Sequence, residues 1–506
     1  MVGPDYAPPG ATLRDRWSAA DSEGVASGGG DLSQWWTVFD DPVLSKLVEM
    51  AYAQNLSLRA AGVRVLEAQA RRGITIGTLF PQTQELTGSY THIRTSGNTS
   101  IVTVNGSSSE SFQAGFDAAW EVDLWGKFRR AIEADDANFL GAVASYDDVL
   151  VTLVAEVAST YVNIRVLDER LAVARDNARV QEDGLRIARV RFEAGGTSQL
   201  DAQQATALLR DTEAGIAELE IERTQSLDSL CVLLGLPPQD LTELLRGSEH
   251  VPEVPMSLTV GIPADLLRQR PDIRSAERAA AAQSARIGVA AAELLPAFQL
   301  TGSVGLSAEE AARFFEGRSF EAMAGPSFTW PVLNYGRLIN NVRLQDATFQ
   351  ELAVEYGNTV LVAQQEVEDA LVGVLRGRVR LARLEESAEA SNRAVDLSLI
   401  QYRAGATDYT AVLNSQQAKV KEDDLLASTR GAVVLSAIAL YKALGGGWEM
   451  RDGHDFVPDE LREAMRSRTY WGGLISPADR ARDIEKAEAD GARRQWWQWR
   501  WWWPKW

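Results

Sequence analysis

The sequence predicts an α+β membrane protein that contains two copies of one unit, each a transmembrane β-hairpin followed by a long α-helical hairpin. Three observations predict this fold: an internal repeat, two very long stretches free of proline, and strand-like alternation ahead of each stretch. Repeats of this size indicate one structural unit used twice, although a chain of 506 residues could form about three separate domains by length alone.

The repeat keeps its register over more than a hundred residues. Positions 210 apart carry matching residues, and the pairs are Trp120 with Trp330, Val122 with Val332, Gly126 with Gly336, Gly195 with Gly405, Thr197 with Thr407, and Gly235 with Gly445. At a spacing of 215, Arg59 and Pro81 recur as Arg274 and Pro296. The predicted divisions are an N-terminal extended segment at 1–50, a first repeat at 51–235, a linker at 236–262, a second repeat at 263–445 and a C-terminal extension with a Trp-rich tail at 446–506.

Two stretches are predicted to be helices of unusual length. Residues 127–192 and 337–402 contain no proline, and an unbroken helix of that length reaches roughly 100 Å. Each stretch ends in a glycine turn followed by threonine, where one helix can stop and the next can start. The predicted helical hairpins therefore span 127–234 and 337–444.

Strands are predicted from strict alternation. Residues 112–124 place apolar side chains at even positions and mostly polar or small ones at odd positions, and residues 320–332 repeat the pattern. The predicted elements are strands at 86–93, 112–124, 298–306 and 320–332, joined by loops at 95–110 and 307–318 into β-hairpins within 84–125 and 297–334. Such lengths suit a tilted membrane strand of about 9 to 11 residues.

These strands could form half of a soluble sandwich or a sheet that faces lipid. The membrane alternative is favoured because no other predicted element covers the apolar face, and because Trp120 and Trp330 lie near strand ends, as interfacial aromatic residues do. Four strands cannot close a barrel, so several copies would be required. Two copies would give eight strands and three would give twelve. A polar inner face that carries Asp117, Glu121 and Asp123 as pore-lining residues favours the larger barrel.

Composition disfavours several classes of function. Lys and Arg total 51 against 70 Asp and Glu, a formal charge of −19, which disfavours nucleic acid as a partner. The single cysteine, Cys231, lies among leucines and is expected to pack in the core. Because His92, His250 and His454 are far apart, we expect no metal site and no cofactor. No pairing of a nucleophile with a base indicates an enzyme.

No run of 18 apolar residues occurs, so no transmembrane helix is expected. The chain begins at Met1 without a basic region and an apolar region, which is consistent with a cytosolic protein or with a mature form whose leader has been removed. Seven of the 15 tryptophans lie in the basic segment 493–506. That composition favours a bilayer interface, and a tail without fixed structure is the alternative. Residues 451–492 suggest no particular role.

Several ordered motifs resemble the TolC-like outer-membrane efflux factors, and within them the lipoprotein subgroup of RND-type tripartite systems. The matching segments are Val2–Tyr6, Trp120–Lys127, Arg270–Arg274, Ile287–Val289 with Leu295–Pro296, Pro331–Arg337 and Thr469–Gly473. The resemblance covers roughly residues 1–447 and the last of these segments. That subgroup carries a leader and a lipidated cysteine just before the first motif, whereas this chain has Met1 there.

The resemblance implies a homotrimer in the bacterial outer membrane, with a twelve-stranded barrel in lipid and a twelve-helix tunnel in the periplasm. An equatorial belt would form from segments near 31–50, 236–262 and 446 onward. The channel would passively conduct drugs, metal ions or other small molecules received from a periplasmic adaptor (membrane fusion) protein and an inner-membrane RND-type pump. The alternative that the residues leave open is a soluble, elongated helical scaffold or adaptor.

The resemblance also assigns roles to the glycine turns. They would be periplasmic tips that dock the adaptor, through Gly195, Gly196, Thr197, Gly405, Ala406 and Thr407. Relatives often place acidic residues just after these turns to form a constriction, and the candidates here are Asp201, Asp408 and Asn414. The position equivalent to Asp201 in the second copy is Ala411, so an acidic ring would rest mainly on the first copy.

Overall fold

The computed structural model describes residues 1–506 except 20, 21, 23, 28–30, 95–107, 249, 262 and 496–506. Most of the loop expected at 95–110 and most of the Trp-rich tail therefore lie outside the described residues. All other predicted elements can be compared with the structure.

The two repeats fold into matching elements. In the first repeat these are α2 (Leu56–Gly77), β2 (Thr83–Arg94), β3 (Ser108–Val122), α3 (Lys127–Glu193) and α4 (Gln199–Leu233). In the second they are α6 (Pro271–Ala292), β5 (Ala297–Ala308), β6 (Phe320–Thr329), α7 (Arg337–Arg403) and α8 (Tyr409–Ala443). Helices α3 and α7 both have 67 residues, and α4 and α8 both have 35. The duplication in the sequence is thus a duplication of structure.

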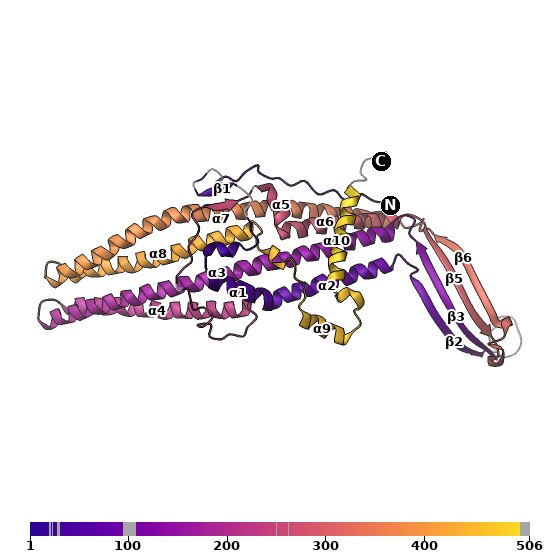
Figure 1. Cartoon of the computed structure of the whole chain (residues 1–506), viewed down its shortest axis with the longest axis horizontal. Helices are drawn as coiled ribbons and strands as arrows, with labels where there is room; N and C mark the ends of the chain where they lie inside the picture. Colours follow the sequence, from indigo (N-terminus) through magenta and orange to yellow (C-terminus); the bar gives the residue numbers. More distant parts are fainter. Residues whose placement is uncertain are drawn as a thin grey trace.

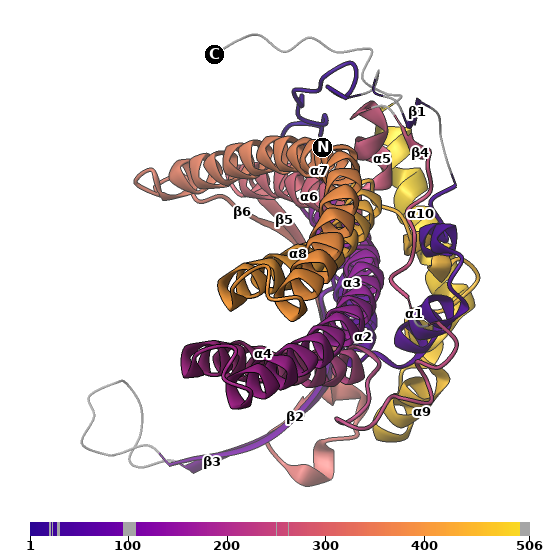
Figure 2. The same cartoon turned by 90° about the vertical axis from the view of Figure 1, so that its left-hand side faces the viewer.

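The molecule is long, with its sheet at one end and its helical tips at the other (Figure 1). Viewed from the tips, the four long helices form a curved wall (Figure 2). The smaller elements lie on the convex side of this wall, and they are α1 (Pro42–Gln54), α9 (Asp459–Arg468), α10 (Pro477–Gln495), and the strands β1 (Val25–Ser27) and β4 (Leu258–Val260). A short helix, α5 (Leu266–Gln269), precedes α6.

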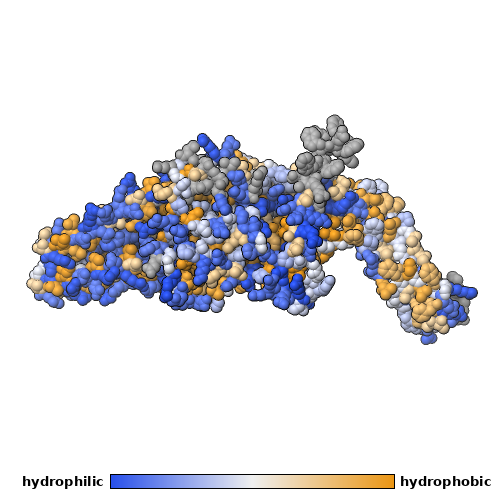
Figure 3. Space-filling model, viewed as in Figure 1, coloured by the Kyte–Doolittle hydropathy of each residue, from blue (hydrophilic) through white to orange (hydrophobic). Residues whose placement is uncertain are grey.

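The four long strands form one antiparallel sheet in the order β2-β3-β5-β6. The register places one set of apolar residues on a single face, and the pairs are Tyr90 with Phe112, Leu86 with Phe116, Phe116 with Val304, Trp120 with Leu300, and Phe298 with Phe328. Many of these side chains are exposed, and apolar residues gather visibly over the sheet (Figure 3). The opposite face is mostly polar, with Glu85 beside Asp117 and Glu121 beside Gln299.

Tryptophans fix the base of the sheet in the same way in both repeats. The Trp120 indole donates to the Leu79 carbonyl oxygen at 3.1 Å, and the Trp330 indole donates to that of Leu294 at 3.0 Å. Each tryptophan thus binds the chain that leaves the preceding helix. An indole has a polar N–H group and an otherwise apolar ring, so tryptophan is favoured at a membrane interface.

The structure differs from the sequence predictions in several details, among them the following three. Strand β6 ends at Thr329 although the alternation continues to residue 332, because Pro331 has no N–H to donate to a ladder. Helix α1 crosses the predicted boundary at residue 50, so the N-terminal segment is not wholly extended. The parallel pair β1–β4 was not predicted, since three residues are too few to show a period.

The equatorial core contains most of the buried apolar residues, and α3 runs through it in contact with α2, α4, α6 and α8. The repeats also share a buried polar contact there. Asn55 Nδ2 donates to the Leu233 carbonyl at 2.9 Å, and Arg270 Nη1 donates to the Ala443 carbonyl at 2.9 Å. In each repeat the start of one helix therefore satisfies a carbonyl at the end of another.

Within the part of the chain that the structure describes, two helices, α3 and α8, are long and apolar enough to cross a membrane by length and composition. In α3, 67% of the apolar window is buried inside the protein, and in α8 the share is 50%. Both helices pack against neighbouring long helices. Their apolar residues therefore belong in large part to the core of the helical wall.

A buried ion cluster joins the first repeat, the second repeat and the C-terminal extension. Asp147 of α3 is fully buried, and its carboxylate lies 3.0 Å from an Arg274 guanidinium nitrogen and 2.8 Å from Arg451 Nε. Burial raises the pKa of the Asp147 carboxyl, while the two guanidinium groups act in the opposite direction. Loss of the carboxylate would leave two guanidinium groups without their shared partner.

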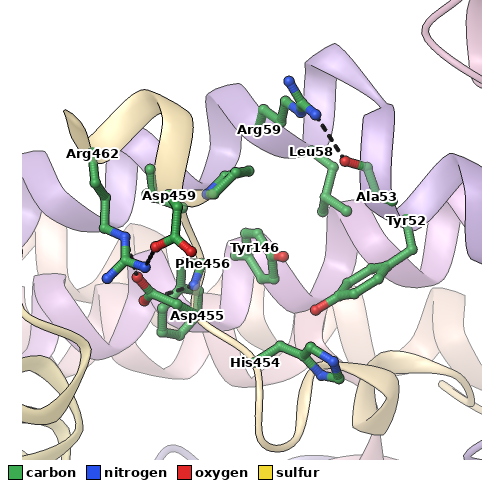
Figure 4. Close-up of a pocket in the computed structure, with 12 residues that line it drawn as sticks. Tyr52, Ala53, Leu58, Arg59, Tyr146, His454, Asp455, Phe456, Asp459 and Arg462 are labelled. Carbon is green, nitrogen blue, oxygen red and sulfur yellow. Dashed lines mark hydrogen bonds and ion pairs between the residues drawn. The ribbon is translucent and has the colours of Figure 1, made fainter. Parts of the chain in front are cut away.

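The C-terminal extension, which suggested no role in the sequence, is attached to the equator by a second set of charges. Arg480 of α10 is 1% exposed, and its Nε donates to the side-chain oxygen of Gln69 in α2 at 3.3 Å. Asp483 of α10 lies 3.2 Å from Arg72, also in α2. Within the extension, Arg480 pairs with Asp455, which lies 3.6 Å from Arg462 Nε. Asp455 and Arg462 border a cavity of about 230 Å³ that Tyr52 and Tyr146 line from the first repeat (Figure 4). The extension therefore packs against α2 and α3, where the sequence predicts an equatorial belt.

We predict that Asp147→Ala destabilises the equator by about 3 to 5 kcal/mol, because it leaves two arginines unpaired. The measurement is the free energy of unfolding of the detergent-solubilised variant. The control is Asp211→Ala, which removes an exposed carboxylate from α4. Equal stability of the two variants would contradict a structural role for the cluster.

Candidate functional site

The two helical tips close with the same geometry. In the first, Gly195 N–H donates to the Phe192 carbonyl at 2.9 Å, and in the second, Gly405 N–H donates to that of Tyr402 at 3.0 Å. The two glycines have φ values of 74° and 73°, in the left-handed region where other residues are strained. Glycine is thus required by the turn itself in both tips.

The tips also expose apolar side chains. Val190, Phe192 and Leu200 flank the first tip, and Leu397 and Ile400 precede the second, and all five are exposed. Apart from Gly195 itself and its two chain neighbours, no heavy atom of the described residues lies within 4 Å of the position that a Cβ on Gly195 would take. Exposed apolar residues around an open turn form a surface that another protein can contact.

Asp201 connects the two tips within one chain. Its carboxylate accepts hydrogen bonds from the Thr197 hydroxyl and, at 3.1 Å, from the hydroxyl of Tyr402 in the other hairpin. Arg191 lies over the Tyr402 ring at 4.4 Å from the centroid and donates to the Tyr402 carbonyl. Burial raises the pKa of the Tyr402 phenol, so the hydroxyl remains a donor at neutral pH. We name Arg191, Asp201 and Tyr402 the tip tie.

The other two predicted constriction residues lie apart from the tip tie. Asp408 is exposed and caps α8, accepting from the Ala411 N–H at 3.3 Å. Asn414 is exposed further along α8. Among the described residues, Asp201 is the candidate whose carboxylate accepts a hydrogen bond from the opposite hairpin.

Sequence analysis did not single out Arg191 or Tyr402 as functional residues. A signal was available, because the copies differ at both positions: the equivalent of Arg191 is Gln401, and the equivalent of Tyr402 is Phe192. Where two otherwise matching repeats carry different residues, the difference indicates a position at which one repeat has a role that the other lacks.

The predicted pore-lining residues divide into two groups. Asp117 and Glu121 lie on the polar face of β3, where Asp117 accepts from the Thr87 hydroxyl at 3.1 Å and Glu121 pairs with Lys127 at 3.2 Å. Asp123 lies beyond the end of the strand, and its carboxylate accepts from the Arg129 backbone and side chain at 3.0 Å. The assignment of Asp123 to the strand surface is therefore corrected: its carboxylate stabilises the first turn of α3.

Among the described residues, no group of three or more His, Cys, Asp or Glu side chains is arranged to hold a metal ion. Cys231 is buried in the equatorial core, with its thiol 3.6 Å from the Gln239 carbonyl oxygen. The described site thus consists of tips and a polar sheet face.

An amphipathic antiparallel sheet joined to long duplicated helical hairpins defines a TolC-like outer-membrane channel with a helical tunnel in the periplasm. The chain belongs to the outer membrane efflux protein family, which it matches over residues 47–236 and 262–446. It is an outer-membrane component of an efflux system, as its relatives are.

Two relatives and one structure illustrate the similarity. Nodulation protein T of Rhizobium leguminosarum bv. viciae is 33% identical over 454 residues, which cover 88% of this chain and 91% of the relative. The pyoverdine export outer membrane protein OpmQ of Pseudomonas putida is 33% identical, covering 82% and 88%. The structure of the outer-membrane channel OprN superposes with a TM-score of 0.83 at 32% identity, covering 88% of this chain and 99% of OprN.

We predict that Tyr402→Phe loosens the first tip by about 1 kcal/mol, because it removes one hydrogen bond to a half-buried carboxylate and keeps the ring. Hydrogen exchange of the amides at the start of α4 should become several-fold faster. Tyr409→Phe is the control, since its hydroxyl has only a long contact of 3.5 Å with Gln416. Unchanged exchange in Tyr402→Phe would show that the tie contributes nothing.

Proposed function

We propose that three copies of the chain assemble into a passive export conduit, with a twelve-stranded barrel and a twelve-helix tunnel. The observation that supports this most strongly is the sheet, whose apolar face is exposed and whose outer strands β2 and β6 each pair on one side only within the described chain. Open strand edges are not tolerated in hydrocarbon, so β2 of one copy would pair with β6 of the next.

Three copies fit the polar face better than two. An eight-stranded barrel has an interior that side chains fill, whereas twelve strands leave a water-filled lumen. The polar face carries Glu85, Asp117 and Glu121, which need water or partners. A soluble scaffold, the alternative from the sequence, would leave the apolar face of the sheet in water.

A periplasmic adaptor would dock at the tips, and an RND-type inner-membrane pump would supply the energy. The exposed apolar residues around Gly195–Thr197 and Gly405–Thr407 support the docking surface. The tip tie would hold the two hairpins together until docking separates them. We propose that the chain catalyses no reaction and that its cargo comprises drugs, metal ions or other small molecules.

We predict that Gly195→Arg abolishes export while trimers still assemble, because a long charged side chain would obstruct the docking surface. Gly453→Arg is a matched control: Gly453 also has positive φ, is exposed and has open space at its Cβ, but it lies at the equator. The measurements are drug resistance of cells and the size of the purified assembly. Equal resistance with both variants would argue against docking at the tips.

We predict that replacing Asp117 and Glu121 with Asn and Gln lowers the preference of the channel for cations by about twofold, since rings of carboxylates favour cations. Reversal potentials in asymmetric KCl across planar bilayers measure this preference. Glu463→Gln on α9, outside the curved wall, should leave it unchanged. If the cation preference stays the same after the replacement of Asp117 and Glu121, as it should in the control, these carboxylates do not line the conducting path.

A further inference from the structure

Lys127 and Arg337 occupy equivalent positions in the two repeats, at the first residues of α3 and α7, where the sheet meets the helices (Figure 1). Lys127 Nζ pairs with Glu121 at 3.2 Å. The residue equivalent to Glu121 in the second repeat is Pro331, which carries no charge. In the described part of the chain, Arg337 forms no ion pair, and its side chain is exposed.

Arg337 borders a cavity of about 300 Å³ at the base of the sheet. Thr329 and Ala297 also line it, and these two are register partners on the polar face of the sheet. Glu121, on the same face, lines it as well. Val122 at the end of β3 lines it too, so the cavity lies where the sheet joins α7 and borders the polar face, which would face the proposed lumen.

The carboxylates around this cavity have partners of their own. Glu121 pairs with Lys127, and Asp123 Oδ2 pairs with Arg129 Nε at 3.0 Å. The third, Glu293, accepts a hydrogen bond from the Asn341 amide at 3.4 Å. Among the described residues, no carboxylate lies at ion-pair distance from Arg337. Its positive charge at this cavity is therefore not neutralised by an ion pair.

We propose that Arg337 contacts exported solutes and binds their anionic groups, such as carboxylates or phosphates, as they pass from the tunnel into the barrel. The guanidinium offers five donors in a planar fork that matches such groups in two-point contact. In a trimer, three copies of Arg337 would form a cationic ring in a chain whose net charge is −19. This inference rests on the proposed trimeric channel and adds a class of cargo to it.

The inference is tested by measuring how strongly citrate reduces the current through the channel in planar bilayers. Citrate added on the tip side should block wild-type current, and Arg337→Gln should weaken the block about tenfold, through loss of charge-assisted hydrogen bonds. Arg337→Lys should restore only part of it, because an ammonium cannot make the two-point contact. Glu121→Gln should strengthen the block, since it frees Lys127 and gives the first repeat the charge pattern of the second.

Arg482→Gln is the control, because it removes an exposed guanidinium from α10 on the outer side of the wall. Its block should equal that of the wild type, and the size of the assembly should be the same for all variants. An Arg337→Gln channel that conducts and is blocked like the wild type would overturn the inference and leave the channel function standing. Absence of conductance in the wild type would instead contradict the proposed function.

Discussion

The structure depends on a four-stranded sheet that one chain cannot satisfy by itself. One face is apolar, the other is polar, and both outer strands have unpaired backbone groups on one side in the described chain. Exposed apolar surface requires lipid or another protein, and unpaired edges require further strands. Helices α3 and α7 follow from this requirement, because each begins at a strand base, after Gly126 or Gly336 in a left-handed conformation. A closed barrel would therefore impose its circumference on the tunnel below it.

The duplication explains which features are structural and which are specialised. Features present in both copies maintain the fold: the glycine turns, the tryptophan contacts at the sheet base and the buried contacts at Asn55 and Arg270. Features present in one copy lie at the proposed sites. Asp201 has Ala411 as its counterpart, and Glu121 has Pro331. A ring with identical units would have sixfold character, so these differences reduce the symmetry of the proposed channel to threefold where cargo and partners meet it.

The sequence predicted the long helices and strands well because their signals are local and repeated. Absence of proline over 127–192 and alternation over 112–124 each persist for many residues, and tertiary packing did not oppose them. The tip tie could not be predicted in the same way, because Asp201 and Tyr402 are 201 positions apart and no period relates them. Asp123 misled the prediction, since alternation continued past the residue where the backbone leaves the sheet. The role of the C-terminal extension depends on single buried charges such as Arg480, which leave no pattern.

The distribution of buried residues decides which end of the helices can move at least cost. The main core surrounds the equator, whereas the core near the tips has only seven buried apolar residues, among them Tyr402 and Tyr409. Asn177 and Gln181 of α3 and Gln416 of α8 are each at most 2% exposed, and they have side-chain atoms without a hydrogen-bond partner among the described residues. Buried amides of this kind weaken an apolar interface. The tips therefore form a small unit of low stability beyond a rigid equator, so a partner that contacts them could separate the hairpins without disturbing the core.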